Sequence, residues 1–265
     1  MTGGGAGEDD LGSYLDFAGR LADAARAVTL EHFRRGIASE AQADLRPVTA
    51  ADRESEAAMR AMIAEAYPHH GIIGEEQGSE RADAEYVWIL DPIDGTRSFA
   101  SGKATYGILV ALAHNGRPIV GVMDEPPLAS RWQGALGRPT TLDGREVRVR
   151  PCAGVGQAWL GATSPHMFRE GIEFERYERL RRRCAQVIYG GECLAYGFLA
   201  CGWLDLVVEA TMDAYDFAAL VPIVEGAGGV ITDWSGAPLT PASDGTVIAA
   251  ANGDLHAEAL EMLGG

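Results

Sequence analysis

The chain has 265 residues, a formal net charge of -16 and a pI of about 4.7, and 47% of its residues are hydrophobic. This length and hydrophobic fraction predict a folded globular protein and exclude a mainly disordered chain. The negative charge argues against a nucleic-acid partner, because affinity for a phosphate backbone comes from lysine and arginine. Solubility accounts for the acidity, and a cluster of carboxylates that binds divalent cations is the alternative.

The first twelve residues are predicted to form a flexible N-terminus, because they are glycine-rich and acidic. They contain no apolar run of the kind found in a secretion signal or a membrane span, so no membrane partner is expected. No C-x-x-C pair occurs among the four cysteines, which favours a reducing, cytoplasmic location. These cysteines are Cys152, Cys184, Cys193 and Cys201.

Residues 13–150 are predicted to form an α+β half. Apolar residues at helical spacing predict helices over residues 13–35 and 52–67. Asn115 and Gly116 accept positive φ, which indicates a hairpin between two strands, and the turn at 142–146 continues the antiparallel pattern. The strands are expected at residues 72–74, 86–90, 106–113 and 118–123.

Residues 151–265 are predicted to form an α/β half, in which strands and helices alternate. The strands are expected at residues 158–162, 186–189, 204–208, 229–232 and 246–250. The helices are expected at residues 173–184, 192–200, 214–226 and 254–263.

Carboxylates follow the ends of several predicted elements. Asp91 and Asp94 stand in D-P-I-D-G, where Pro92 is expected to end the strand and Asp94 to cap the turn. Glu75 and Glu76 follow another apolar strand, and Asp216 lies where a helix begins. Each has a simpler explanation, since D-P-x-D-G is also a good turn sequence and an acid is favoured at a helix N-terminus.

The combination of these acids is harder to explain without a ligand, because converging carboxylates repel one another unless cations lie between them. Oxygen ligands without histidine or cysteine favour Mg²⁺ over zinc. Thr96 follows at the start of a predicted helix, where free backbone N–H groups are suited to bind phosphate. The pattern therefore predicts metal-assisted hydrolysis of a phosphate ester.

The joint pattern resembles the inositol monophosphatase superfamily, over residues 13–262. The segments that carry the resemblance are PVTAAD (47–52), GEE (74–76), DPIDGT (91–96), and YDFAA with EGAGG (215–229). The resemblance implies a layered αβαβα sandwich, a small-molecule phosphate ester as substrate, two or three Mg²⁺ ions per active site, and a homodimer.

The resemblance also implies roles for individual residues. The metal ligands would be Glu75, Asp91, the carbonyl of Ile93, Asp94 and Asp216. Gly95 and Thr96 would bind the phosphate. Asp52 and Thr96 would orient and deprotonate the attacking water, and Glu75 would join them as a catalytic residue.

Within the superfamily, the chain is most similar to the histidinol-phosphatase branch of histidine biosynthesis. Arg97 and Ser98 follow the DPIDGT segment where inositol phosphatases more often have Thr-Asn. Glu192 and Glu209 lie at expected substrate-selecting positions together with Arg97, and two acids suit a cationic substrate such as L-histidinol phosphate. The alternative for Glu192 is that it begins a helix and interacts with the helix dipole.

Three departures leave the substrate open. Glu192 replaces the aspartate of that branch, Leu194 replaces a tyrosine, and Gln42 stands where relatives often carry a lysine. The alternatives are therefore an inositol-1-monophosphatase, or another sugar, cyclitol or secondary-metabolite phosphatase. A non-catalytic binding relative, and a nucleotide bisphosphate phosphatase, are further alternatives; the first would be favoured by a missing metal ligand, and the chain lacks none.

Overall fold

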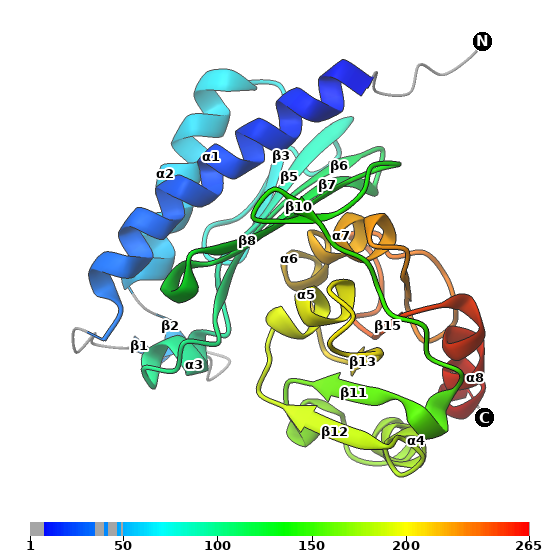
Figure 1. Ribbon diagram of the computed structural model, residues 1–265. Helices are drawn as coiled ribbons and strands as arrows, with labels where there is room; N and C mark the ends of the chain where they lie inside the picture. Colours follow the sequence, from blue (N-terminus) through cyan, green and yellow to red (C-terminus); the bar gives the residue numbers. More distant parts are fainter. Residues whose placement is uncertain (1–7, 35–39, 42–46, 49, 265) are drawn as a thin grey trace.

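The computed structural model describes residues 8–34, 40–41, 47–48 and 50–264, and these form five layers of alternating helices and sheets (Figure 1). Helices α1 (Glu8–His32) and α2 (Ala50–Ala66) cover the outer face of an eight-stranded sheet. Three short helices separate this sheet from a five-stranded sheet, and two more helices cover the far side. The expected αβαβα sandwich is therefore confirmed.

The eight-stranded sheet has the order β10-β9-β8-β7-β6-β5-β3-β4 and is antiparallel except where β3 pairs with β5. Asn115 and Gly116, with φ of 49° and 79°, form the predicted two-residue turn between β6 and β7. The strands are β3 (Gly71–Gly74), β4 (Gly78–Glu80), β5 (Tyr86–Asp94), β6 (Gly107–His114), β7 (Arg117–Glu125), β8 (Ser130–Ala135), β9 (Thr141–Leu142) and β10 (Arg145–Glu146). A separate pair is formed by β1 (Glu40–Ala41) and β2 (Pro47–Val48).

The N-terminal helix begins earlier than the sequence predicted. Residues 8–12 belong to α1, so the expectation of a flexible segment over residues 1–12 is wrong for these five residues. Leu11 is buried among the apolar residues that α1 packs against the sheet, and this burial extends the helix by more than one turn.

The five-stranded sheet has the order β12-β11-β13-β15-β14, in which β11 pairs in parallel with β12 and β13. Its strands are β11 (Trp159–Ala162), β12 (Gln186–Tyr189), β13 (Leu206–Glu209), β14 (Val230–Thr232) and β15 (Val247–Ala250). Helices α4 (Ile172–Arg181) and α8 (Gly253–Gly264) cover its outer face.

The helices between the sheets are α5 (Leu194–Ala200), α6 (Ala214–Phe217) and α7 (Leu220–Gly226), and the other short helices are α3 (Thr96–Ala100) and the 3₁₀ turns η1 (Pro126–Leu128), η2 (Val155–Gln157) and η3 (Pro165–Met167). The single helix expected over residues 214–226 is wrong, because the chain breaks it at Ala218 and Ala219. Pro222 explains the break: its ring would clash with the carbonyl of the residue four positions earlier, and it donates no hydrogen bond.

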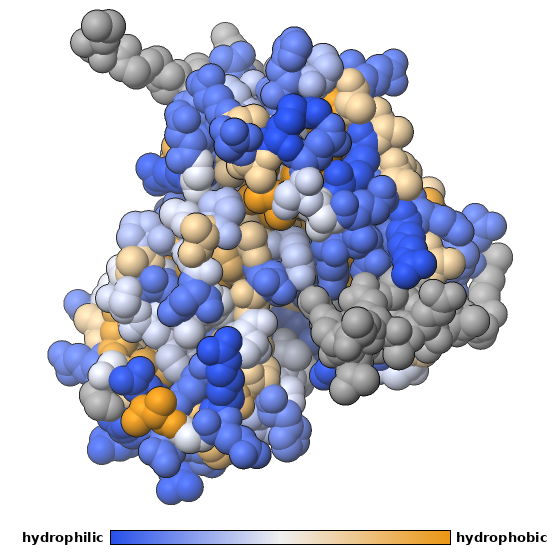
Figure 2. All heavy atoms as spheres, turned by 180° about the vertical axis from the view of Figure 1, so that it is seen from behind, coloured by the Kyte–Doolittle hydropathy of each residue, from blue (hydrophilic) through white to orange (hydrophobic). Residues whose placement is uncertain are grey.

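The surface is mainly polar. The face drawn in Figure 2 is mostly hydrophilic, with small scattered hydrophobic areas. Within the described ranges, every helix is too short or too polar to cross a bilayer.

Candidate active site

A bulge at the end of β5 brings two aspartates to the same side of the sheet. Asp91 pairs with Leu109 and Asp94 with Gly107, so two residues of β5 oppose the single residue Ile108 of β6. Residues three positions apart in a regular strand point to opposite faces, and one extra residue reverses this. The expectation that Pro92 ends the strand is wrong, since a bulge accepts a residue that cannot donate a hydrogen bond.

The third aspartate comes from the second half of the chain. Asp216 lies in α6, where it and Asp213 form a reciprocal capping box. One carboxylate oxygen from each of Asp91, Asp94 and Asp216 lies within 4.8 Å of the others. Two segments 122 to 125 residues apart therefore meet at one carboxylate cluster.

Each of these aspartates is held by one backbone N–H and keeps its other oxygen available. The N–H of Ile93 donates to Oδ1 of Asp91 at 3.0 Å, and the N–H of Cys193 donates to Oδ2 of Asp94 at 2.7 Å. Asp213 donates its N–H to Oδ2 of Asp216, also at 2.7 Å. The expected capping of the next turn by Asp94 is wrong, because Gly95 is the N-cap of α3 and no side chain caps this helix. Such anchoring orients carboxylates toward a shared ligand.

The cluster carries an electrostatic penalty that a cation would remove. Burial, followed by the charges of Glu75, Asp94, Asp216 and Asp52, raises the pKa of Asp91 well above its usual value. Burial also raises the pKa of Asp94 to about 6, against the hydrogen bonds from Cys193, and raises that of Asp216 well above normal. No basic side chain in the described ranges forms an ion pair with these three aspartates, so the site suits a divalent cation bound by oxygen ligands.

Ten of the eleven residues predicted for the site line one cavity of about 470 Å³ around this cluster. They are Glu75, Asp91, Ile93, Asp94, Gly95, Thr96, Arg97, Glu192, Glu209 and Asp216. Asp52 does not line the cavity; it is fully buried in the first turn of α2, where its charge acts on Asp91. Gln42 lies outside the described residues.

Glu192 has an unusual backbone conformation at the cavity wall. Its φ is 48°, and α5 begins two residues later at Leu194, so the interpretation of Glu192 as a helix-starting acid is wrong. Its Oε1 accepts a hydrogen bond from Ser98 Oγ at 2.7 Å. A non-glycine residue in the left-handed region costs of the order of 1 kcal/mol, and such residues cluster at functional sites.

Both carboxylate oxygens of Glu209 accept hydrogen bonds, whereas Glu192 accepts one through Oε1. Glu209 Oε1 accepts from the N–H of Thr163 at 2.8 Å, and its Oε2 accepts from the hydroxyl of Tyr196 at 3.1 Å. Burial raises its pKa to about 7, although these hydrogen bonds oppose the rise. Glu209 is therefore a fixed part of the cavity wall, and it is fully charged only above about pH 7.

Sequence reasoning missed the remaining residues of the cavity wall. They are Ser98, Ser101, Lys103, Thr163, Ser164, Met167, Gly190, Ala210, Thr211 and Met212. Two of them carried a usable signal: Thr163 follows a predicted strand as Asp91 does, and Lys103 is the only lysine in the chain. The others come from short helices and loops that the tertiary fold brings together.

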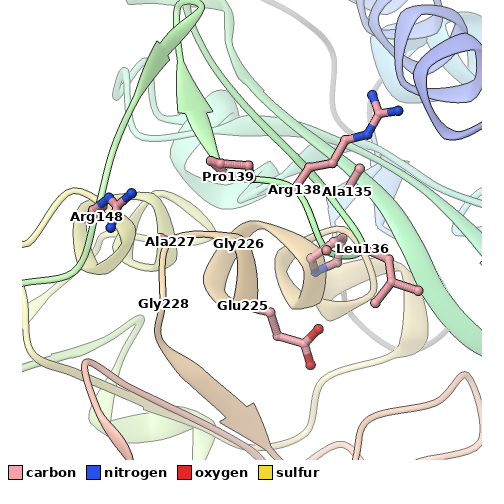
Figure 3. A pocket seen from close by; sticks show the side chains of 11 residues that line it. Ala135, Leu136, Arg138, Pro139, Arg148, Glu225, Gly226, Ala227 and Gly228 are labelled. Carbon is pink, nitrogen blue, oxygen red and sulfur yellow. The ribbon is translucent and has the colours of Figure 1, made fainter. Parts of the chain in front are cut away.

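A second cavity of about 360 Å³ lies between the turn after β8 and the end of α7 (Figure 3). Its charged lining residues are Arg138, Arg148 and Glu225, and Figure 3 shows that the side chains of Arg138 and Glu225 point in different directions. It lacks a group of converging carboxylates, so the candidate metal site is the first cavity.

The sequence profile of the inositol monophosphatase family matches residues 10–264. The chain is 43% identical to "Bifunctional phosphatase IMPL2, chloroplastic" of Arabidopsis thaliana, covering 97% of this chain and 76% of that protein. It is 35% identical to a histidinol-phosphatase of Mycobacterium tuberculosis, covering 95% and 98%. An inositol monophosphatase structure from Zymomonas mobilis superposes with a TM-score of 0.88 at 42% identity, covering 95% and 98%. The chain therefore belongs to the inositol monophosphatase family of phosphatases.

Proposed function

We propose that the protein is a Mg²⁺-dependent phosphatase that hydrolyses L-histidinol phosphate to L-histidinol and phosphate. The observation that carries the chemistry is the set of three aspartates, each anchored by a backbone N–H, with carboxylate oxygens within 4.8 Å. Mg²⁺-dependence is general in this family and fits the all-oxygen donor set.

Metal binding is assigned to Asp91, Asp94 and Asp216, with Glu75 and the carbonyl of Ile93 as further ligands. When bound, Mg²⁺ supplies a Lewis acid for the phosphoryl oxygens and lowers the pKa of water. The other roles belong to neighbouring residues. The N–H groups of Gly95 and Thr96 bind the phosphate at the uncapped start of α3, in line with the left-handed φ of 83° at Gly95.

Proton transfer from the attacking water is assigned to Thr96 and the buried Asp52. Thr96 Oγ1 donates to the carbonyl of Ile93 at 3.2 Å, so its hydrogen is directed away and its lone pairs are left to accept from water. For the proton to reach Asp52, which does not line the cavity, the Thr96 hydroxyl would leave the carbonyl of Ile93, pass its own hydrogen to Asp52 and take one from the water. Glu75 would help to orient the water. Direct attack of water on phosphorus breaks the P–O bond to the alcohol and needs no protein nucleophile.

The choice of L-histidinol phosphate rests on the acids of the cavity wall. Glu192 is half-buried, oriented by Ser98 and accessible from the cavity, which suits an ion pair with the substrate ammonium group. Glu209 lines the same cavity and contributes negative charge above its raised pKa of about 7, and Arg97 lies at the exposed rim. The histidinol-phosphatase relatives support the same assignment.

myo-Inositol 1-phosphate is the second candidate, because the structural neighbour from Z. mobilis is described as an inositol monophosphatase. The decisive experiment measures phosphate release with Mg²⁺ from L-histidinol phosphate, myo-inositol 1-phosphate, fructose 1,6-bisphosphate and adenosine 3′,5′-bisphosphate. We expect kcat/KM for L-histidinol phosphate to be about a hundredfold higher than for the inositol ester, or about 2.7 kcal/mol.

The variant Glu192→Gln tests the role of the carboxylate charge, since it keeps the shape of the side chain and removes its charge. It is expected to erase most of the preference for L-histidinol phosphate while leaving hydrolysis of the inositol ester in place. A wild-type preference for the inositol ester would overturn the substrate assignment, and no hydrolysis of any ester would favour a binding protein. We further propose a homodimer and a cytoplasmic location, which light scattering and cell fractionation test.

A further inference from the structure

The chain has 22 lysine and arginine residues, of which Lys103 is the only lysine. Lys103 lines the candidate active-site cavity. The other 21 positively charged side chains are arginines. No catalytic step above uses Lys103. Its ammonium group is a compact cation with three hydrogen-bond donors, so its position in the cavity determines which substrate atoms it can contact.

The backbone at Lys103 is fixed by the end of α3. The N–H of Lys103 donates to the carbonyl of Ser98 at 2.9 Å, and the N–H of Gly102 donates to that of Phe99 at 3.0 Å. With Gly102 at a φ of 75°, these bonds form a Schellman motif. Arg34 Nε also donates to the carbonyl of Gly102 at 2.9 Å. The base of the lysine side chain is therefore held in a defined place.

The ammonium group lies beside the segment that precedes Glu192. Lys103 Nζ lies 3.3 Å from the point where a Cβ atom at Gly190 would be, so a side chain at this position would crowd the ammonium. Gly190 is held by its N–H, which donates to the carbonyl of Thr163 at 3.0 Å, and its φ is 80°. The lysine of the first half thus meets the second half at a residue without a side chain.

No described residue forms an ion pair or a side-chain hydrogen bond with Lys103, although the cavity contains many carboxylates. Glu192 lies two residues beyond Gly190, but its carboxylate accepts a hydrogen bond from Ser98 and does not pair with Lys103. The cavity wall therefore presents a cation and an anion that are not paired with each other. A ligand that satisfies both carries a positive group for Glu192 and a hydrogen-bond acceptor for Lys103.

We propose that Lys103 is a specificity-determining residue that donates a hydrogen bond to an uncharged acceptor on the alcohol part of the substrate. This inference rests on the proposed function, in which the acceptor is the unprotonated nitrogen of the imidazole ring while Glu192 pairs with the amine. The imidazole nitrogen accepts only in the neutral ring, so binding through Lys103 weakens as pH falls below about 6.5.

The test compares L-histidinol phosphate with 2-aminopropyl phosphate, which keeps the phosphate and the amine and lacks the ring. In Lys103→Met, the ratio of kcat/KM for the two esters is expected to fall about tenfold, mainly through KM for L-histidinol phosphate. Lys103→Arg should recover part of the ratio. The wild-type KM for L-histidinol phosphate should rise below about pH 6.5, and this rise should be smaller in Lys103→Met.

Arg145→Met is the matched control, because it removes one exposed positive charge outside the cavity and should leave the ratio unchanged. An equal loss for both esters in Lys103→Met would mean that the lysine binds the phosphate, and an unchanged ratio would mean that it does not contact the ring. Either result overturns the inference while the proposed function stands. If the wild-type protein does not hydrolyse L-histidinol phosphate, the proposed function fails and the inference fails with it.

Discussion

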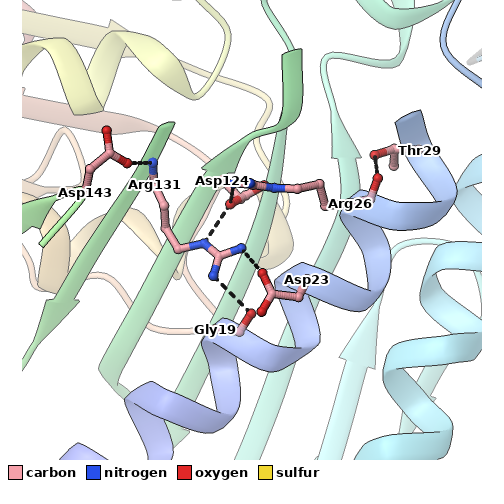
Figure 4. A network of polar contacts seen from close by, with 7 residues as sticks. All are labelled: Gly19, Asp23, Arg26, Thr29, Asp124, Arg131 and Asp143. Atoms are coloured by element: carbon pink, nitrogen blue, oxygen red, sulfur yellow. Dashed lines mark hydrogen bonds and ion pairs between the residues drawn. The ribbon is translucent and has the colours of Figure 1, made fainter. Parts of the chain in front are cut away.

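Asp124 and Asp91 are buried aspartates in the same eight-stranded sheet, and their surroundings differ in charge. Asp124 is fully buried and accepts hydrogen bonds from Arg26 Nε at 2.7 Å and Arg131 Nε at 2.6 Å (Figure 4). Arg131 also pairs with Asp23 of α1 at 2.6 Å. Asp91 is equally buried but has acidic neighbours. Asp124 thus links a helix to the sheet through arginine side chains. Asp91 has no such basic partner, so its negative charge can be balanced by a bound cation.

Asp94→Asn is expected to give the largest effect on activity. It removes one charge from the carboxylate cluster that we propose binds Mg²⁺, so turnover should fall by about a thousandfold or more. The folded protein without metal should be at least as stable near neutral pH, because the raised pKa of Asp94 shows that its charge is unfavourable there. Phosphate release and thermal unfolding measure the two effects. Unchanged turnover would exclude Asp94 as a metal ligand.

Asp124→Asn should have the opposite pair of effects. It leaves Arg26 and Arg131 partly buried without their shared counter-charge, and losing one member of a buried ion pair costs about 3 kcal/mol. Denaturant unfolding should show this loss, while kcat of the remaining folded protein should stay near the wild-type value. A large fall in kcat without destabilisation would show that the network also acts on the active site.

Mg²⁺ should stabilise the protein more at high pH than at low pH. Folded-state pKa values that are raised at Asp91, Asp94 and Asp216 mean that the metal-free protein binds more protons than the unfolded chain above about pH 4. The stability of the metal-free protein therefore falls as pH rises through that range. A bound cation would offset the repulsion between the carboxylates that have lost their protons. We expect saturating Mg²⁺ to raise Tm by about 5 °C near pH 8 and by much less near pH 5.5.

Calorimetry at the two pH values measures this difference, and Asp94→Asn serves as the control because it should lose most of the Mg²⁺ effect. Asp124→Asn should keep it, since Asp124 already has cationic partners. Equal shifts in Tm at the two pH values would contradict binding to the titrating cluster.

Most helices and strands and the carboxylate cluster could be predicted because their signals are local, whereas the layered αβαβα arrangement was expected only from the family resemblance. Alternating apolar runs indicated the strands, Asn115 and Gly116 indicated a hairpin, and acids after apolar segments indicated the metal site. The bulge at Pro92 could not be predicted in this way, because proline in a strand sequence more often marks its end. The bulge depends on the register with β6, which only the folded sheet defines.

Long-range partners were the other features that sequence alone could not give. Asp124 meets Arg26 across 98 residues, and Glu192 meets Ser98 across 94. No spacing rule connects such positions. The conformation of Glu192 was also misread, because a polar residue before an apolar helix usually belongs to the helix start.

Ser98→Ala is expected to give the smallest effect, and it tests whether the anchor of Glu192 matters for the substrate. The variant removes the hydroxyl that donates to Glu192 Oε1 at 2.7 Å and leaves the carboxylate in place. Because only orientation is lost, KM for L-histidinol phosphate should rise about threefold, or about 0.6 kcal/mol, with kcat and Tm almost unchanged. Ser235→Ala, which removes a hydroxyl far from the cavity, is the control. An equal rise in KM for myo-inositol 1-phosphate would show that Ser98 shapes the cavity in general, whereas a selective rise would mean that the wall is organised around the charge of Glu192.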